Sequence, residues 1–296
     1  MSYPLVSIVT VNYKQVQETV KMLESIPKTK YPNLEVIVVD NEETQDNSSV
    51  YQEAYPGVIV LRSEQNLGFA GGNNLGSRHA KGDYLYYLNN DTILTEKTIQ
   101  PLIEAFAEDP QLGAASPKIR YFYTPEKIQY AGFSSIHPIT GRNMAIGKNQ
   151  FNTSEYDETR ETYSVHGAAM MISRAVIEKV GLMSEDFFLY YEELDWSAQI
   201  QKAGYKIKYV GEAFVFHKES VATGKMSPLK TYYHTRNRIL FMKRNFSKQE
   251  YRLFKGYFFS VVLPKEMIKY LFMVRMTNLK ALLDGTFDAV KSPTIK

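Results

Sequence analysis

Short apolar runs alternate with amphipathic stretches over the first ninety residues. The runs are rich in Val, Ile, Leu and Tyr, which is typical of buried strands, and they occupy residues 6–11, 34–39, 58–61 and 84–88. After the first run, Val16, Val20 and Leu23 recur at helical spacing, and a second helix is expected from Gly68 to Ala80. Since strands that alternate with helices form βαβ units, the pattern predicts an α/β fold with a parallel, doubly wound sheet.

Polar side chains follow each of these predicted strands. They are Asn12, Asp40, Asn66 and Asp91. Parallel connectivity places all four strand ends at one edge of the sheet, which is where open α/β sheets bind ligands. Any one of them alone could be an ordinary polar turn, because Asn and Asp favour turns. Four of them at a single edge indicate a site.

The segment 66–74 is rich in glycine and precedes a predicted helix. Glycine lets backbone approach a ligand closely, and the free N–H groups at a helix start favour phosphate. The segment is neither a Walker loop, since no Gly-Lys-Ser/Thr follows, nor the dinucleotide fingerprint, since Ala70 replaces its second glycine. Taken alone, the segment is better explained as a plain turn, and only its place at the same edge of the sheet favours a site.

The rest of the chain is less regular. A helix is expected from Thr98 to Ala107, and residues 117–165 suggest irregular strands and loops that could form an acceptor-side wall. Apolar strands are expected at 167–172 and 210–216, and the second ends in His217. A single histidine after a strand is usually structural, unless Asp91 lies nearby.

Three acids cluster among aromatic residues just before a helix that runs to Ala203. They are Glu192, Glu193 and Asp195. The dipole at a helix start favours negative charge, which would explain one acid without any catalytic role. Three acids against an aromatic wall favour a general base.

Composition adds an uneven charge to this picture. The 296 residues carry a net charge of +3 and no cysteine, which fits a reducing compartment. Residues 225–296 hold 15 Lys and Arg against 4 Asp and Glu, a net charge of +11, so the preceding residues are acidic. A basic, aromatic-rich tail suggests contact with an anionic surface. No apolar run reaches the roughly 18 residues that span a bilayer.

The order and spacing of several motifs resemble an inverting family-2 glycosyltransferase of the GT-A fold, in the branch with bacterial rhamnosyl- and galactofuranosyltransferases. The resemblance covers nearly the whole chain, and its motifs lie at 6–13, 40–41, 66–74, 88–92, 190–195, 217 and 232–238. It implies a GT-A catalytic domain over residues 1–224, with a donor half at about 1–92 and an acceptor half at about 93–224. Residues 225–296 would form a helical C-terminal region.

The resemblance implies a nucleotide-sugar pocket at the predicted edge of the sheet. Asp40 would accept a hydrogen bond from the base N3–H, and Asn66 and Gly68 would lie along the nucleotide. The implied pocket residues are Thr10, Asn12, Asp40, Asn66, Gly68, Asn89 and Asn90. The implied donor is dTDP-rhamnose or a UDP-sugar, and the implied acceptor is a glycan or a lipid-linked glycan used in cell-surface polysaccharide synthesis.

The resemblance also implies a divalent cation, Mn²⁺ or Mg²⁺. Asn89-Asn90-Asp91 stands where the family has its metal-binding Asp-x-Asp, and His217 matches a histidine that can complete the metal shell. Because Asn89 replaces the first acid, Asp91 is the only carboxylate of the motif. The cation would then rely on donor phosphates and water.

The family base is the second residue of a Glu-Asp pair, and Glu193 stands at that position. Its side chain is one methylene longer than the usual Asp. Glu192 and Asp195 therefore remain alternatives for the base.

The basic tail contains an apolar helical face. A single helical projection from Glu266 to Leu283 groups seven apolar residues on one side: Ile268, Leu271, Phe272, Met276, Leu279, Leu282 and Leu283. Such a face suits a membrane interface, or packing against the body of the protein or against a second subunit of a homo-oligomer. Since this family commonly extends lipid-linked glycans, the expected partner is a membrane rather than nucleic acid. The expected location is cytoplasmic, at the inner face of the plasma membrane.

Two other functions compete with sugar transfer. A nucleotide-sugar pyrophosphorylase would need a glycine-rich loop with a basic residue directly after the first strand, where this chain has Asn12-Tyr13-Lys14-Gln15. A non-catalytic nucleotide- or glycan-binding protein of the same fold is suggested by the departures at Asn89 and Glu193.

Overall fold

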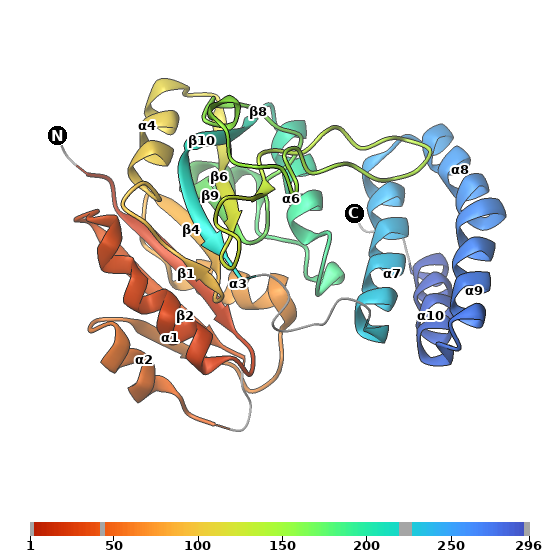
Figure 1. The fold of residues 1–296 in the computed structure, drawn as a ribbon, viewed down its shortest axis with the longest axis horizontal. Helices are drawn as coiled ribbons and strands as arrows, with labels where there is room; N and C mark the ends of the chain where they lie inside the picture. Colours follow the sequence, from red (N-terminus) through yellow and green to blue (C-terminus); the bar gives the residue numbers. More distant parts are fainter. Residues whose placement is uncertain (1–2, 42–44, 219–226, 293–296) are drawn as a thin grey trace.

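The first part of the chain forms four parallel strands in the computed structural model, which describes residues 3–41, 45–218 and 227–292. The strands are β1 (Val6–Asn12), β2 (Leu34–Asp40), β3 (Ile59–Arg62) and β4 (Tyr84–Asn89), in the order β3-β2-β1-β4. They are joined by α1 (Val16–Ser25) with a 3₁₀ turn (Ile26–Thr29), α2 (Ser48–Ala54) and α3 (Gly68–His79) (Figure 1). The predicted βαβ arrangement is confirmed.

The second part extends this sheet with both antiparallel and parallel pairings. Beyond β4 lie β9 (Ala169–Ser173), β6 (Leu112–Tyr121), β10 (Lys206–His217) and β5 (Thr92–Ile93). Two short strands join their neighbours, β7 (Ile128–Tyr130) on β6 and β8 (Arg160–Glu161) on β10. The helices of this part are α4 (Gln100–Glu108), α5 (Arg174–Val180) and α6 (Glu192–Lys202), with short 3₁₀ turns at Ser154–Tyr156 and Glu185–Phe187. The result is a mixed sheet.

The irregular region expected at 117–165 begins later than predicted, because residues 117–121 belong to β6. Pro117 obscures the strand pattern in the sequence, since proline cannot donate to a ladder. The structure accommodates it with a bulge. Pro117 pairs with Val210 and Lys118 with Phe214, so residues 211–213 of β10 bulge out of the ladder. Most of residues 122–168 is irregular, as expected.

The two faces of the sheet bury separate hydrophobic cores. Along β2, Val36 and Val38 face one core and Ile37 and Val39 face the other, as the period of two in a strand requires. Helices α1 and α4 cover the first face, and α3 and α6 cover the second. Burying an aliphatic side chain of this size stabilises the fold by about 1.5–3 kcal/mol. These cores hold the strand ends, and hence the polar edge, in place.

The C-terminal region is helical, as predicted, and stands beside the sheet (Figure 1). It contains α7 (Pro228–Asn245), α8 (Lys248–Tyr257), a π-helical turn (Phe258–Val262), α9 (Leu263–Phe272) and α10 (Met276–Lys291). Ser227 and Ser247 cap α7 and α8 with their side chains. A third hydrophobic core joins this region to the sheet-containing part through Phe187 and Leu194.

The single helix expected from Glu266 to Leu283 is wrong, because the chain turns between α9 and α10. Val274 takes a φ of 52°, and the N–H of Arg275 donates to the Tyr270 carbonyl at 2.8 Å. The turn divides the predicted apolar face. Leu279 and Leu282 are buried, whereas Phe272 is 85% exposed.

No helix within the described residues is both long and apolar enough to cross a membrane.

Candidate active site

Asp40 lies fully buried at the end of β2, opposite Asn12 of β1. Its carboxylate accepts hydrogen bonds from Asn12 Nδ2 at 2.9 Å, Asn47 Nδ2 at 3.0 Å and Tyr51 Oη at 3.4 Å. These bonds connect β1, β2 and α2. A nucleoside base at Asp40 would have to share the carboxylate with these three donors.

The amide of Asn90 joins the same polar edge. Its Nδ2 lies 3.1 Å from Thr19 Oγ1 and 3.4 Å from Asn12 Oδ1. Thr10 lies two residues before Asn12, on the same face of β1. It is buried, and its hydroxyl has no hydrogen-bond partner within the described residues. The structure therefore brings Thr10, Asn12, Asp40 and Asn90 together.

Asn66 and Gly68 shape the loop that enters α3. Asn66 Oδ1 accepts from the Gly68 N–H at 2.9 Å, and Gly68 has a φ of 70°. A Cβ at Gly68 would lie 2.4 Å from the Phe188 carbonyl oxygen, so no other residue fits there. Asn41 was not among the predicted site residues. It is buried next to this loop, its Nδ2 donates to the Gly68 carbonyl, and its Oδ1 has no partner among the described residues.

Asp91 and His217 come together, although 126 residues separate them in the sequence. His217 Nε2 lies 3.0 Å from Asp91 Oδ1, and both side chains are buried. Asn89 Nδ2 lies 3.4 Å from the same ring nitrogen. On the other side of the ring, Gln129 Oε1 lies 2.8 Å from Nδ1. An oxygen acceptor faces Nδ1, so Nδ1 is the nitrogen that donates to Gln129, and Nε2 is directed toward Asp91.

This pair fits a divalent cation. Asp91 Oδ1 is buried and makes no aligned hydrogen bond among the described residues, and it faces the Nε2 nitrogen of His217. A carboxylate oxygen and an imidazole nitrogen are both ligands that a divalent cation accepts, and the two atoms lie 3.0 Å apart. Gln129 would hold the ring orientation, as outer-shell acceptors commonly do. No third His, Asp or Glu joins the pair within the described ranges.

His166 lies beside this pair, with its ring centroid 6.5 Å from that of His217. Burial, followed by the nearby charges of His217 and Lys148, lowers the pKa of His166 to about 3. His166 is therefore neutral at physiological pH and adds no charge near Asp91.

The acid pair, Glu192 and Glu193, opens α6. Glu192 is buried, and its Oε2 has no hydrogen-bond partner among the described residues. Burial, and then the charge of Glu193, raises the pKa of Glu192 well above its usual range, and burial also raises the pKa of Glu193. A carboxylate with a raised pKa is a stronger base, which suits proton abstraction.

Asp195 occupies a different environment from the acid pair. Its side chain is buried, Oδ1 accepts from Asn245 Nδ2 at 2.7 Å, and Oδ2 lies 3.2 Å from Arg244 Nη1. Asp195 therefore ties α6 to α7, and its two oxygens are already occupied. This placement favours Glu193 over Asp195 as the base.

The segment 166–168 links the acid pair to the Asp91–His217 pair. The Ala168 carbonyl accepts from the Asn89 N–H at 3.0 Å, and His166 packs on His217. A Cβ on Gly167 would lie 3.6 Å from Glu193 Cδ. The two chemical clusters thus flank the same three residues, as a shared active site requires.

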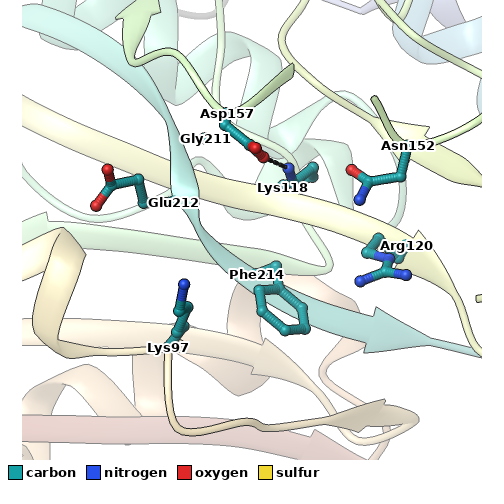
Figure 2. A pocket seen from close by; sticks show the side chains of 8 residues that line it. All are labelled: Lys97, Lys118, Arg120, Asn152, Asp157, Gly211, Glu212 and Phe214. Carbon is teal, nitrogen blue, oxygen red and sulfur yellow. Dashed lines mark hydrogen bonds and ion pairs between the residues drawn. The ribbon is translucent and has the colours of Figure 1, made fainter. Parts of the chain in front are cut away.

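A polar pocket of about 240 Å³ lies elsewhere, over the β10 bulge (Figure 2). It is lined by Lys97, Lys118, Arg120, Asn152, Asp157, Gly211, Glu212 and Phe214. None of the predicted site residues lines it. Lys118 is buried there and bonds to Asp157, as the dashed line in Figure 2 shows.

The sequence model described as glycosyl transferase family 2 matches residues 7–181. These residues contain β1 except for Val6, then β2 to β4 and the segment around Asp91, whereas His217 and the acid pair lie beyond them.

Two curated relatives match much of the chain. The low-salt glycan biosynthesis hexosyltransferase Agl10 of Haloferax volcanii is 24% identical over 98% of this chain and 92% of its own length. The N-acetylglucosaminyl-diphospho-decaprenol L-rhamnosyltransferase of Mycobacterium tuberculosis is 24% identical over 74% of this chain and 77% of its own length.

Three solved structures share the fold. GalNAc-T7 with UDP, GalNAc and Mn²⁺ has a TM-score of 0.65 at 18% identity and covers 84% of this chain and 50% of its own. The mannosyltransferase PcManGT from Pyrobaculum calidifontis, with GDP-Man and Mn²⁺, has a TM-score of 0.60 at 15% identity. The match covers 98% of this chain and 88% of PcManGT. TarS 1-349 of S. aureus, in complex with UDP-GlcNAc, has a TM-score of 0.60 at 14% identity. The match covers 97% of this chain and 81% of the TarS chain. The predicted GT-A fold is confirmed.

Proposed function

This chain belongs to glycosyl transferase family 2, and we propose that it moves a rhamnosyl or hexosyl group from a dTDP- or UDP-sugar to a glycan or lipid-linked acceptor, with inversion. The observation that carries the proposal is that Glu193 and the Asp91–His217 pair flank one segment, 166–168. The relatives named as a hexosyltransferase and a rhamnosyltransferase support the two sugar classes.

Asp91 and His217 would hold the divalent cation through Oδ1 and Nε2. When bound, Mn²⁺ or Mg²⁺ neutralises the charge that develops on a departing nucleotide diphosphate. Gln129 would orient the His217 ring by accepting from Nδ1, so that Nε2 faces Asp91. The buried amides at the edge of the sheet, Asn12 and Asn90, preserve the shape of the nucleotide side of the site.

Glu193 takes the proton of the acceptor hydroxyl in this proposal. Its raised pKa makes it a better proton acceptor than an exposed glutamate. The hydroxyl oxygen then attacks the anomeric carbon from the face opposite the nucleotide, and a single displacement inverts that centre. The non-catalytic binding protein considered above is disfavoured, because relatives over most of the chain are named transferases.

The C-terminal helices would contact an anionic membrane surface peripherally. Exposed apolar side chains gather on α8 to α10: Leu253, Phe259, Val261, Ile268, Leu271, Phe272, Met273, Val274, Met276, Leu283, Phe287 and Val290. Exposed basic residues lie among them, including Lys255 and Lys265, whereas Lys269 and Lys280 pair with Glu266 and Asp284. An apolar surface with basic flanks complements anionic lipids and would bring the site to a lipid-linked acceptor.

A donor panel tests the proposal. dTDP-rhamnose, UDP-glucose, UDP-galactose and UDP-N-acetylglucosamine are each added at increasing concentration, with and without Mn²⁺, and the unfolding temperature is measured. A true donor at 100 times its Kd stabilises the protein by about 2.7 kcal/mol, and Mn²⁺ should increase the shift. In the Asp91→Ala variant, the additional shift in unfolding temperature that Mn²⁺ causes should vanish. No shift with any donor would contradict the proposed function, and an intact Mn²⁺ effect in Asp91→Ala would contradict the metal assignment.

A further inference from the structure

The loop that precedes the acid pair, residues 187–191, holds an unusual backbone. Phe188, Tyr190 and Tyr191 have φ values of 60°, 68° and 76°. Residues with a Cβ rarely adopt this left-handed region, because the side chain then crowds the backbone. Such strain persists only where surrounding contacts hold it, and it is found most often at functional sites. Since Tyr191 directly precedes α6, this loop sets where the acid pair begins.

Asn237 of α7 supplies the central contacts of the loop. Its side chain is fully buried, and Nδ2 lies 2.8 Å from the carbonyl oxygens of Phe187 and Leu189 and 2.7 Å from that of Tyr190. Arg236 Nη1 donates to Asn237 Oδ1 at 2.9 Å. Three carbonyl oxygens around one atom require a donor there, and an amide NH₂ has two protons to share among them.

Aromatic rings and α3 complete the support. Phe188 stacks on Tyr233 at 5.3 Å between ring centroids, and Tyr190 stacks on His234 at 4.3 Å. From the opposite side, the Phe69 N–H donates to the Phe188 carbonyl at 2.8 Å. The loop is therefore held between the glycine-rich segment and α7.

We propose that Asn237 is a positioning residue for the general base. It holds the strained 187–191 loop in the conformation from which Glu193 reaches the acceptor hydroxyl. The inference rests on the proposed function, in which Glu193 is that base. The proposal also gives a role to the segment 232–238. This segment resembles a motif of the family, but the catalytic scheme above assigns no role to it.

A residue that only filled the interface between α6 and α7 would not need to donate to three carbonyls of one loop. The apolar neighbours of Asn237 in α7, Ile239 and Leu240, already provide that packing in the third hydrophobic core. The three acceptors of the Asn237 Nδ2 group all lie in one strained loop, so this buried amide determines the path of that loop. Asn237 acts through the backbone and does not touch the substrate.

Asn237→Asp tests the inference with almost no change in shape. It places a carboxylate oxygen against three carbonyl oxygens, which removes the donors and adds repulsion. Hydrogen exchange of the amides in 187–195 should speed up at least tenfold. With the donor found in the panel, kcat should fall at least 30-fold while KM for the donor stays within threefold. The acidic limb of the kcat profile should move to lower pH, because the released acid pair becomes more exposed to water.

Asn278→Asp is the matched control, because Asn278 is also a buried asparagine of the helical region. Its Nδ2 donates to Thr231 Oγ1 at 2.9 Å, away from the 187–191 loop. This variant should be destabilised without faster exchange in 187–195 and without the change in the pH profile. If Asn237→Asp does not fold, Asn237→Ser, which keeps one donor, should show intermediate changes in exchange and kcat.

Wild-type exchange rates in 187–195 in a folded Asn237 variant would overturn the inference. So would a kcat within threefold of wild type, or equal effects in Asn278→Asp. The exchange comparison needs no substrate. A failure of the proposed function, seen as no turnover of any donor by the wild-type protein, is therefore distinguishable from a failure of Asn237 to hold the loop.

Discussion

Glu192 and Glu193 are adjacent in sequence but differ in environment. Glu192 is buried with one carboxyl oxygen unpartnered among the described residues, whereas Glu193 is half-buried beside Gly167. Burial, and then the charge of Glu193, raises the pKa of Glu192 well above its usual range. Because the two carboxyl groups interact, the pair loses its protons in two steps, and the apparent pKa of each step is a property of the pair and not of one residue. Because the pKa of Glu192 is raised further than that of Glu193, a proton shared by the pair resides preferentially on Glu192.

This raised pKa predicts a pH-dependent stability. Between the ordinary glutamate pKa of about 4.3 and the raised value, the folded protein holds a proton that the unfolded chain has lost. The free energy of unfolding should therefore decrease as pH rises through this window, by up to about 1.4 kcal/mol per pH unit. Glu192→Gln should match wild type near pH 4 and be the more stable protein at pH 8. Parallel curves for the two proteins in urea unfolding would contradict a buried, neutral Glu192.

At the scale of elements, the apolar runs predicted the strands, and the polar residues after them predicted the polar edge of the sheet. Strands β1 to β4 have strong patterns, and each delivers a polar side chain to one edge. The partners of those side chains could not be predicted in the same way. Gln129 lies on a three-residue strand, and Asn237 lies in a helix far along the chain. Neither has a local pattern, because their roles depend on contacts 88 and 47 to 50 residues away.

The α9–α10 turn shows a second limit. A helical projection continues through residues 273–275 because their side chains fit the period. Tertiary packing breaks the helix there and buries Leu279 and Leu282 while Phe272 stays exposed. Similarly, the sequence kept Asp195 as an alternative to Glu193 for the base, since only the structure shows Asp195 paired with Arg244.

The Asp195–Arg244 pair predicts a stability effect between elements α6 and α7. Asp195→Ala should lower the free energy of unfolding by about 3–5 kcal/mol, because it leaves a largely buried Arg244 without its carboxylate. Turnover of the folded fraction should fall less than tenfold. Asp46→Ala removes the partner of Arg62 in a largely exposed pair and should change the unfolding midpoint far less. A large loss of kcat without loss of stability in Asp195→Ala would return Asp195 to the candidates for the base.

At the scale of the whole molecule, net positive charge and exposed apolar side chains are both concentrated in the C-terminal helices. The α9–α10 turn presents Phe272 and Val274, which are 85% and 81% exposed, to solvent. In Figure 1 this turn and the carboxyl end of β1 both lie in the lower half of the view. The division of the chain at residue 224 remains a prediction, since the third hydrophobic core contains Leu194 and Phe254, one from each side of it.

This surface predicts binding to anionic vesicles. Wild-type protein should co-sediment with phosphatidylglycerol vesicles more than with phosphatidylcholine vesicles, and less so in high salt. Phe272→Asp combined with Val274→Asp should reduce the bound fraction at least fivefold, because two charges then oppose insertion. Val50→Asp, on α2, is the control and should bind as wild type does. Unchanged sedimentation of the double variant would contradict the membrane contact, and a change from dimer to monomer instead would assign the surface to a second copy.

The most direct test of the account is the turnover of Glu193→Gln with Mn²⁺, the donor selected by the panel, and water or a lipid-linked glycan as acceptor. Glutamine keeps the shape of the side chain but cannot take a proton. Nucleotide release should fall by about 10²–10⁴ relative to wild type, the usual contribution of a general base, while the donor-induced thermal shift stays unchanged. A rate within threefold of wild type, with donor binding intact, would contradict the assignment of Glu193 as the base.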